Sequence, residues 1–100
     1  MNTLEVKKID ESETMQLLQS NNSLALTAIL RDIVPAIMPL LHIHINRLSL
    51  SNEDVEEVIA ISLASLWHQR KHIKGDLQSN LYLILRNSML NFRSKNHEGC

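Results

Sequence analysis

The sequence is poor in cysteine, which forms disulfides, in glycine and proline, which interrupt helices, and in aromatic residues, which stack on rings and bases. Its 100 residues include one cysteine (Cys100), two glycines, two prolines and three aromatic residues. A single cysteine excludes a disulfide within the chain and fits a cytoplasmic location. Residues 1–22 carry charges throughout, so we expect no signal peptide. The most apolar run, residues 33–45, contains two prolines and two histidines and is too short to span a bilayer.

The residues that are present indicate helices. The chain is 44% hydrophobic and 21% charged, which is typical of a folded globular protein. No stretch alternates polar and apolar residues for long enough to predict a sheet. We therefore expect an all-α protein, a compact bundle of three to four helices. The expected division is an N-terminal segment with a short helix (residues 1–22), the helical domain (residues 23–96) and a mobile tail (residues 97–100).

Apolar residues at three- and four-residue steps predict helices over residues 11–19, 24–47, 54–71 and 80–93. Pro35 and Pro39 each remove a backbone donor, so the second helix should kink or break there. Ile61 falls outside the apolar face of the third helix. Residues 73–76 should form a loop in which Gly75 is free to take a positive φ. The expected N-caps are Ser51 or Asn52 for the third helix and Asp76 or Ser79 for the fourth.

The net charge of −1 conceals two regions of opposite sign. Residues 1–67 hold nine acidic and four basic residues, a net charge of −5. Residues 68–97 hold six basic residues and one acidic residue, a net charge of +5. The last third of the chain is therefore where we look for a polyanion, and the acidic part is where we look for a basic protein. A solvated basic surface is the simpler interpretation of charge alone.

The sequence offers little for catalysis, and we expect no enzyme, no metal and no cofactor. It has no glycine-rich phosphate loop and no GxSxG nucleophile motif. His42 and His44 are two residues apart and point in different directions on a helix. His68 and His72 are four apart and could share a metal, but no third ligand can be named. Trp67 is interpreted as a core residue at a helix end and not as a stacking platform.

Residues 54–96 follow a specific order: an acidic start (DVEEV), an apolar stripe ending in Leu66 and Trp67, a basic connection (HQRKHIKGD) and a last helix (LYLILRNSMLNFRSK). This order resembles the second conserved region of bacterial RNA polymerase sigma factors of the extracytoplasmic-function type. Those proteins typically show DAEDLVQEVFLRLW, a basic loop containing FRG, and then WLYRIARNLALDYLRR. Residues 29–35 (ILRDIVP) resemble the family's LYRRYYP. The resemblance covers residues 24–96.

The resemblance implies a promoter-recognition domain that binds core RNA polymerase and the minus-ten promoter element to start transcription. The helix over residues 54–67 would dock on the coiled coil of the largest polymerase subunits, and the basic connection with the last helix would bind promoter DNA. The polymerase-binding residues so implied are Asp54, Glu57, Ile61 and Leu63. The DNA-binding residues so implied are Arg70, Lys71, Lys74 and Arg86 for phosphates, and His72, Asn80 and Asn87 for base edges.

Departures from the family pattern keep other interpretations open. Ala60 and Ile61 stand where the family usually has Gln-Glu, and Asn80 stands where it has tryptophan. These favour a sigma-like helical interaction domain that binds polymerase, an anti-sigma protein or a second copy without melting DNA. A complete factor continues into a helix-turn-helix, so the resemblance implies a fragment or a short member with altered duty. A third interpretation is an unrelated helical bundle that forms a homodimer through residues 33–45.

Overall fold

A computed structural model describes residues 11–98, and describes their side chains up to residue 92. The elements in chain order are α1 (Glu11–Gln19), α2 (Leu24–Ala28), the π-helical turn η1 (Ile29–Ile33), α3 (Val34–Arg47), α4 (Asn52–His68), the 3₁₀ turn η2 (Arg70–His72) and α5 (Leu77–Glu98). Since α2, η1 and α3 run on without a break, they form one helix, and the described chain is a bundle of four. The expected all-α fold is confirmed.

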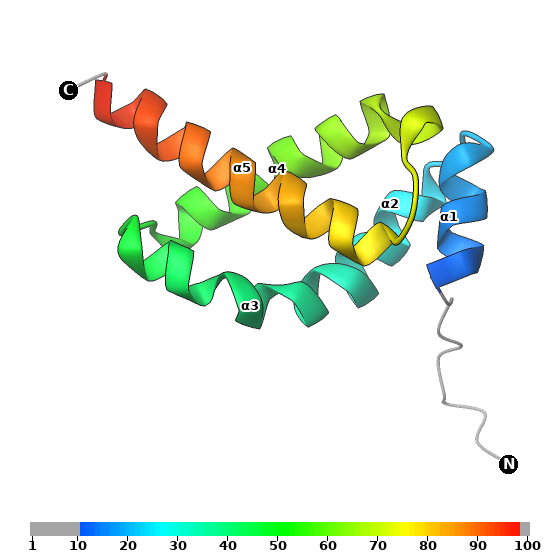
Figure 1. The fold of residues 1–100 in the computed structure, drawn as a ribbon, viewed down its shortest axis with the longest axis horizontal. Coiled ribbons are helices and arrows are strands. Elements are labelled where there is room, and N and C mark those ends of the chain that lie inside the picture. Colours follow the sequence, from blue (N-terminus) through cyan, green and yellow to red (C-terminus); the bar gives the residue numbers. More distant parts are fainter. Residues whose placement is uncertain (1–10, 99–100) are drawn as a thin grey trace, which may run out of the picture.

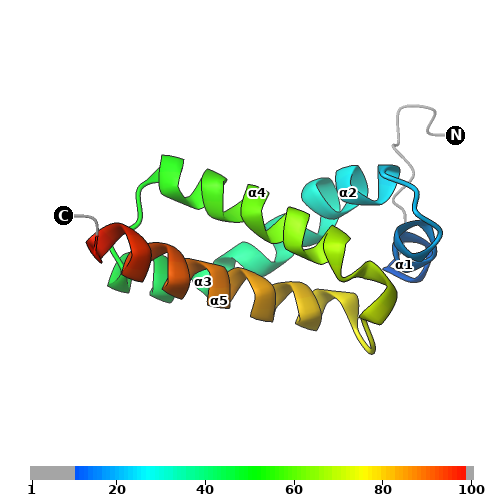
Figure 2. The same ribbon diagram turned by 90° about the horizontal axis from the view of Figure 1, so that it is seen from above.

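The core lies between the long helices, with α5 packed on both α4 and α3 (Figures 1 and 2). Because four residues are just over one helical turn, residues at that step line one face of α5. The corresponding buried face of α4 includes a polar residue, Ser62. The residues on these two faces with no exposed surface are Val58, Ser62 and Leu66 of α4 and Leu77, Leu81, Leu85 and Met89 of α5.

The proline-containing helix bends but does not break, so of the expected kink or break the structure shows a kink. Pro35 has no N–H, so it cannot bond the carbonyl four residues before it. The backbone widens there into a π-helical turn, in which the Val34 N–H bonds the Ile29 carbonyl. The axis curves between α2 and α3 in Figure 1. Leu30, which lies in this wider turn, is 50% exposed.

The joined helix Leu24–Arg47 has 24 residues, and it is long and apolar enough to cross a membrane by length and composition alone. The expectation from the sequence concerned residues 33–45 alone, which are only part of this longer helix. The core helix of a soluble protein meets the same test. In this fold Ile29, Ile37 and Leu41 have no exposed surface, because they are packed against the rest of the bundle.

The ends of the last two helices differ from their predicted positions. Helix α4 begins with a capping box, in which Ser51 and Asp54 each accept a backbone N–H of the other. It ends at His68 and not at residue 71, because the chain turns into η2. Helix α5 begins at Leu77 and not at Asn80, and Asp76 is its cap. Its backbone stays helical to Glu98, beyond the predicted end at residue 93; residues 99–100 of the expected tail lie outside the described chain.

Candidate nucleic-acid interface and docking faces

Residues 70–76, in the connection between α4 and α5, hold three basic residues and one acidic residue and are called the basic loop from here on. Ile73 is only 8% exposed and anchors the middle of the loop in the core. Lys71, His72 and Lys74 are exposed on either side of that anchor. Gly75 has a φ of 81°, and an added Cβ would meet nothing within 4 Å. Glycine is therefore needed there for backbone conformation and not for space.

Arg70, a predicted phosphate ligand, is engaged inside the protein. Its Nε donates to Asn21 Oδ1 at 2.7 Å, and one of its terminal nitrogens donates to the Trp67 carbonyl at 2.7 Å. Its guanidinium also lies 4.2 Å from the centre of the Trp67 ring. Arg70 thus caps the end of α4, covers a face of the indole and holds the loop to the turn after α1. Trp67 packs against the core as expected.

Asn80, predicted to contact base edges, also uses its side-chain amide for hydrogen bonds within the protein. Its Nδ2 donates to the Lys74 carbonyl at 2.8 Å and to the Asp76 carbonyl at 2.7 Å. These bonds tie the second half of the basic loop to the first turn of α5. Asn80 is half-buried, and its hydrogen bonds support the loop from the side of the bundle. The donor that would recognise a base is already used.

Arg86 and Asn87 lie apart from the basic loop, farther along α5. Nine residues separate Leu77 from Arg86, which is about 14 Å along a helix axis. Arg86 is half-buried and Asn87 is exposed, and adjacent helical residues point about 100° apart. The structure therefore brings Lys71, His72 and Lys74 together, and it places Arg86 and Asn87 on a separate surface.

The four predicted polymerase-binding residues of α4 do not share one face. Ile61 (46% exposed) and Leu63 are two residues apart and point about 200° from each other. Asp54 is occupied by the capping box, whereas Glu57 is exposed. Leu63 lines a shallow groove of about 280 Å³ between η1 and α4, which the sequence did not predict. Its lining residues are Leu30, Glu56, Ile59, Ala60 and Leu63.

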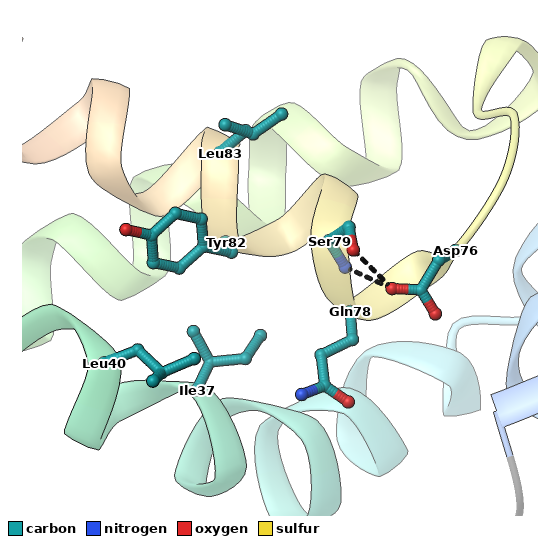
Figure 3. Close-up of a pocket in the computed structure, with 7 residues that line it drawn as sticks. All are labelled: Ile37, Leu40, Asp76, Gln78, Ser79, Tyr82 and Leu83. Atoms are coloured by element: carbon teal, nitrogen blue, oxygen red, sulfur yellow. Dashed lines mark hydrogen bonds between the residues drawn. The ribbon is translucent and has the colours of Figure 1, made fainter.

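A second, larger groove of about 490 Å³ lies between α3 and the start of α5. Figure 3 shows Tyr82 and Gln78 extending from α5 toward Ile37 and Leu40 of α3. Leu40 is 60% exposed at the edge of this groove. The hydrogen bonds from the Ser79 backbone N–H and hydroxyl to Asp76, at 2.7 and 2.6 Å, lie at the α5 end of this groove.

Two carboxyl groups meet at the N-terminus of α5. Glu11 Oε2 accepts the Leu77 N–H at 2.8 Å, and Asp76 accepts from Ser79. Hydrogen bonding to Asp76, with a contribution from burial, raises the pKa of Glu11 above its ordinary value. Hydrogen bonds from Ser79, and then from Glu11, lower the pKa of Asp76. Of the two carboxyl groups, Glu11 therefore takes up a proton more readily than Asp76 does.

The described residues contain no group of three or more histidine, cysteine, aspartate or glutamate side chains that could hold a metal. His68 is the last residue of α4 and His72 belongs to η2, so the two do not sit one turn apart on a single helix. The histidine spacing that made a shared metal conceivable is therefore lost at the end of α4.

No protein-family model, curated protein or solved structure matches this chain.

Proposed function

We propose that this chain is a sigma-type promoter-recognition domain whose basic loop binds single-stranded promoter DNA while α4 docks on core RNA polymerase. One observation carries the proposal. The basic loop exposes Lys71, His72 and Lys74, and hydrogen bonds from the Arg70 side chain and to the Lys74 carbonyl attach it to the bundle at both ends. Cations on a pre-ordered loop lose little conformational entropy when they bind phosphates. The resemblance of residues 24–96 to sigma factors places DNA capture at the same loop.

The hydrogen bonds of Arg70 and Asn80 reduce the number of residues that we propose to contact DNA. Lys71 and Lys74 are the proposed phosphate ligands, since both are exposed. His72 is exposed between them and offers ring nitrogens to a base edge. Asn80 and Arg70 are proposed to support the loop, because the Asn80 amide group and two of the three Arg70 side-chain nitrogens bond protein atoms. Arg86 and Asn87 are proposed to contact the strand where it continues along α5.

The polymerase-docking surface is proposed to wrap around α4. One flank carries Glu57 and Ile61, and the opposite flank carries Glu56 beside Leu30 and Leu63. Exposed apolar side chains next to carboxylates suit a partner helix that presents both basic and apolar residues.

Binding of a labelled single-stranded minus-ten oligonucleotide, followed by fluorescence anisotropy with and without core polymerase, tests the DNA role. The variant Lys71→Ala/Lys74→Ala should weaken binding about tenfold or more at 0.1 M salt. It should also reduce the slope of log affinity against log salt by about 1.4, which is about 0.7 for each lost phosphate contact on single strands. Arg47→Ala, an exposed cation at the end of α3, is the matched control and should change neither quantity. Equal losses in both variants, or no binding by the wild type, would reject the DNA role.

The two apolar grooves favour a second candidate function, a helical interaction domain that binds protein and not DNA. Leu30 and Leu40 are 50% and 60% exposed, each beside a groove. Sedimentation equilibrium of the wild type and of Leu40→Gln separates this candidate from the first. A concentration-dependent dimer that Leu40→Gln abolishes, together with no DNA binding, would favour the interaction domain.

A further inference from the structure

Helix α1 touches both ends of the basic loop. At one end Asn21, in the turn after α1, accepts the Arg70 Nε–H at 2.7 Å. At the other end Glu11, the first residue of α1, accepts the Leu77 N–H at 2.8 Å, immediately after the loop. Both views show α1 beside the connection between α4 and α5 (Figures 1 and 2).

The segment that makes these two bonds, α1 with the turn that follows it, is itself held in place. Thr14 and Leu18 of α1 are 1% and 0% exposed. Asn21 has a φ of 66°, and its N–H bonds the Leu18 carbonyl at 3.2 Å. Asparagine tolerates this left-handed conformation better than most residues do. The Asn21 side chain therefore reaches Arg70 from a backbone that is held in one conformation. The nine residues of α1 set the distance between the two attachment points, Glu11 and Asn21.

We propose that α1 is a brace that sets the geometry of the basic loop, with Asn21 and Glu11 as its positioning residues. Asn21 acts through Arg70, and Glu11 acts through the first N–H of α5. The brace rests on the proposed function only for its effect on DNA binding. Residues 11–22 lie outside the region that resembles sigma factors, so the resemblance does not imply this brace.

A brace that positions the loop and a general contribution to stability predict different results when the two bonds are removed. If α1 positions the loop, releasing its bonds loosens residues 70–76 and leaves α3 and α4 as protected as before. If the bonds only add to global stability, every part of the bundle opens more often. Lys71 and Lys74 are tryptic sites within the loop, and Arg47, the last residue of α3, is a tryptic site outside it. One digest therefore compares the two regions.

The experiment is limited trypsin digestion of the full chain under native conditions, with cleavage sites assigned by intact mass. Asn21→Gly removes the acceptor while keeping the positive φ accessible, and Glu11→Ala removes the second bond. The double variant should be cut after Lys71 and Lys74 about tenfold faster, with cleavage after Arg47 unchanged. Asn21→Asp keeps an acceptor for Arg70 and should digest like the wild type. Ser49→Gly, which changes the other described non-glycine residue with positive φ (56°), is the backbone control.

Each outcome decides the proposal. An unchanged loop cleavage rate, or a rate that rises equally after Arg47, overturns the brace. Should the double variant fail to fold, the single variant Asn21→Gly and its rescue by Asn21→Asp make the same comparison. In the anisotropy assay the brace variants should lose affinity with an unchanged salt slope, because no phosphate ligand is removed. Selective loop cleavage in a protein that binds no DNA keeps the brace and rejects only the proposed function.

Discussion

Ser62 is buried at the centre of α4, and its hydroxyl has no hydrogen-bond partner among the described residues. A buried polar group without a partner is destabilising, whereas its small size lets α5 approach closely. The residue is therefore explained by its volume and not by its polarity.

Ser62→Ala should raise the free energy of unfolding by up to about 1 kcal/mol, because it removes the unpartnered hydroxyl and improves helix propensity. Urea denaturation followed by circular dichroism measures the change. Ser62→Val is the size control and should lower the free energy by about 1–3 kcal/mol through overpacking. A loss of stability in Ser62→Ala would show that the hydroxyl has a partner after all.

The Glu11–Asp76 pair gives the stability a pH dependence of known sign. The pKa of Glu11 is raised above 4.5, so its stabilising contribution is complete below that pH and is lost as pH rises through the folded value. The pKa of Asp76 is lowered below 3.8, so its contribution is present above that pH and is lost as pH falls through the folded value. The pair is most favourable when Glu11 is protonated and Asp76 is ionised.

Glu11→Gln keeps an acceptor for the Leu77 N–H and a donor toward Asp76 at every pH. We therefore expect this variant to gain stability relative to the wild type as pH rises from 4 to 7. Urea unfolding at pH 4, 5, 6 and 7 measures the difference. A difference that stays constant over this range would contradict the raised pKa of Glu11.

At the scale of elements, Asp54 belongs to the start of α4 more than to a docking face. Its carboxylate accepts the Ser51 N–H at 3.0 Å, and its own N–H bonds the Ser51 hydroxyl at 3.0 Å. An acidic residue at this position also favours the helix dipole. Asp54 is therefore a poor residue with which to test polymerase binding, because its removal changes the helix itself.

Asp54→Ala should lower the free energy of unfolding by about 1 kcal/mol, since the reciprocal cap is lost. Glu57→Ala, one turn farther along α4 and exposed, should change it by less than about 0.5 kcal/mol. Chemical denaturation of the two variants side by side provides the measurement. If both variants are equally stable, the capping box contributes nothing, and Asp54 becomes available as a docking residue.

At the scale of the whole molecule, one hydrophobic cluster includes residues from α1 to α5. Leu18, Ile37, Leu66 and Leu85 all belong to it, and none has any exposed surface. Trp67, the only tryptophan, packs against the same cluster. A single shared core predicts that the described helices unfold together.

The thermal transition followed by Trp67 fluorescence should therefore coincide with the transition followed by far-ultraviolet circular dichroism. Leu85→Ala should lower the free energy of unfolding by about 2–5 kcal/mol while the two transitions still coincide. Leu83→Ala, on the exposed side of α5, is the control and should change stability far less. An earlier fluorescence transition would indicate that the end of α4 unfolds separately.

The sequence alone was enough for the presence of the helices, for a cap at Ser51 or Asn52 and for the positive φ of Gly75, although not for the helix ends. These features depend on residues within one or two turns of each other, so local spacing contains the information. It also predicted that Ile61 lies off the core face. What only the tertiary structure decided is which polar groups remain available.

Arg70 and Asn80 have the residue types expected of DNA ligands, yet the Asn80 amide group and two of the Arg70 side-chain nitrogens bond other groups of the protein. The partner of Arg70 lies 49 residues away in the chain, and the Leu77 partner Glu11 lies 66 residues away. No periodicity reports such pairs, because they form only when α1 packs beside the basic loop. The cationic character of the loop was therefore present in the sequence, whereas its shape and its free cations were set by the fold.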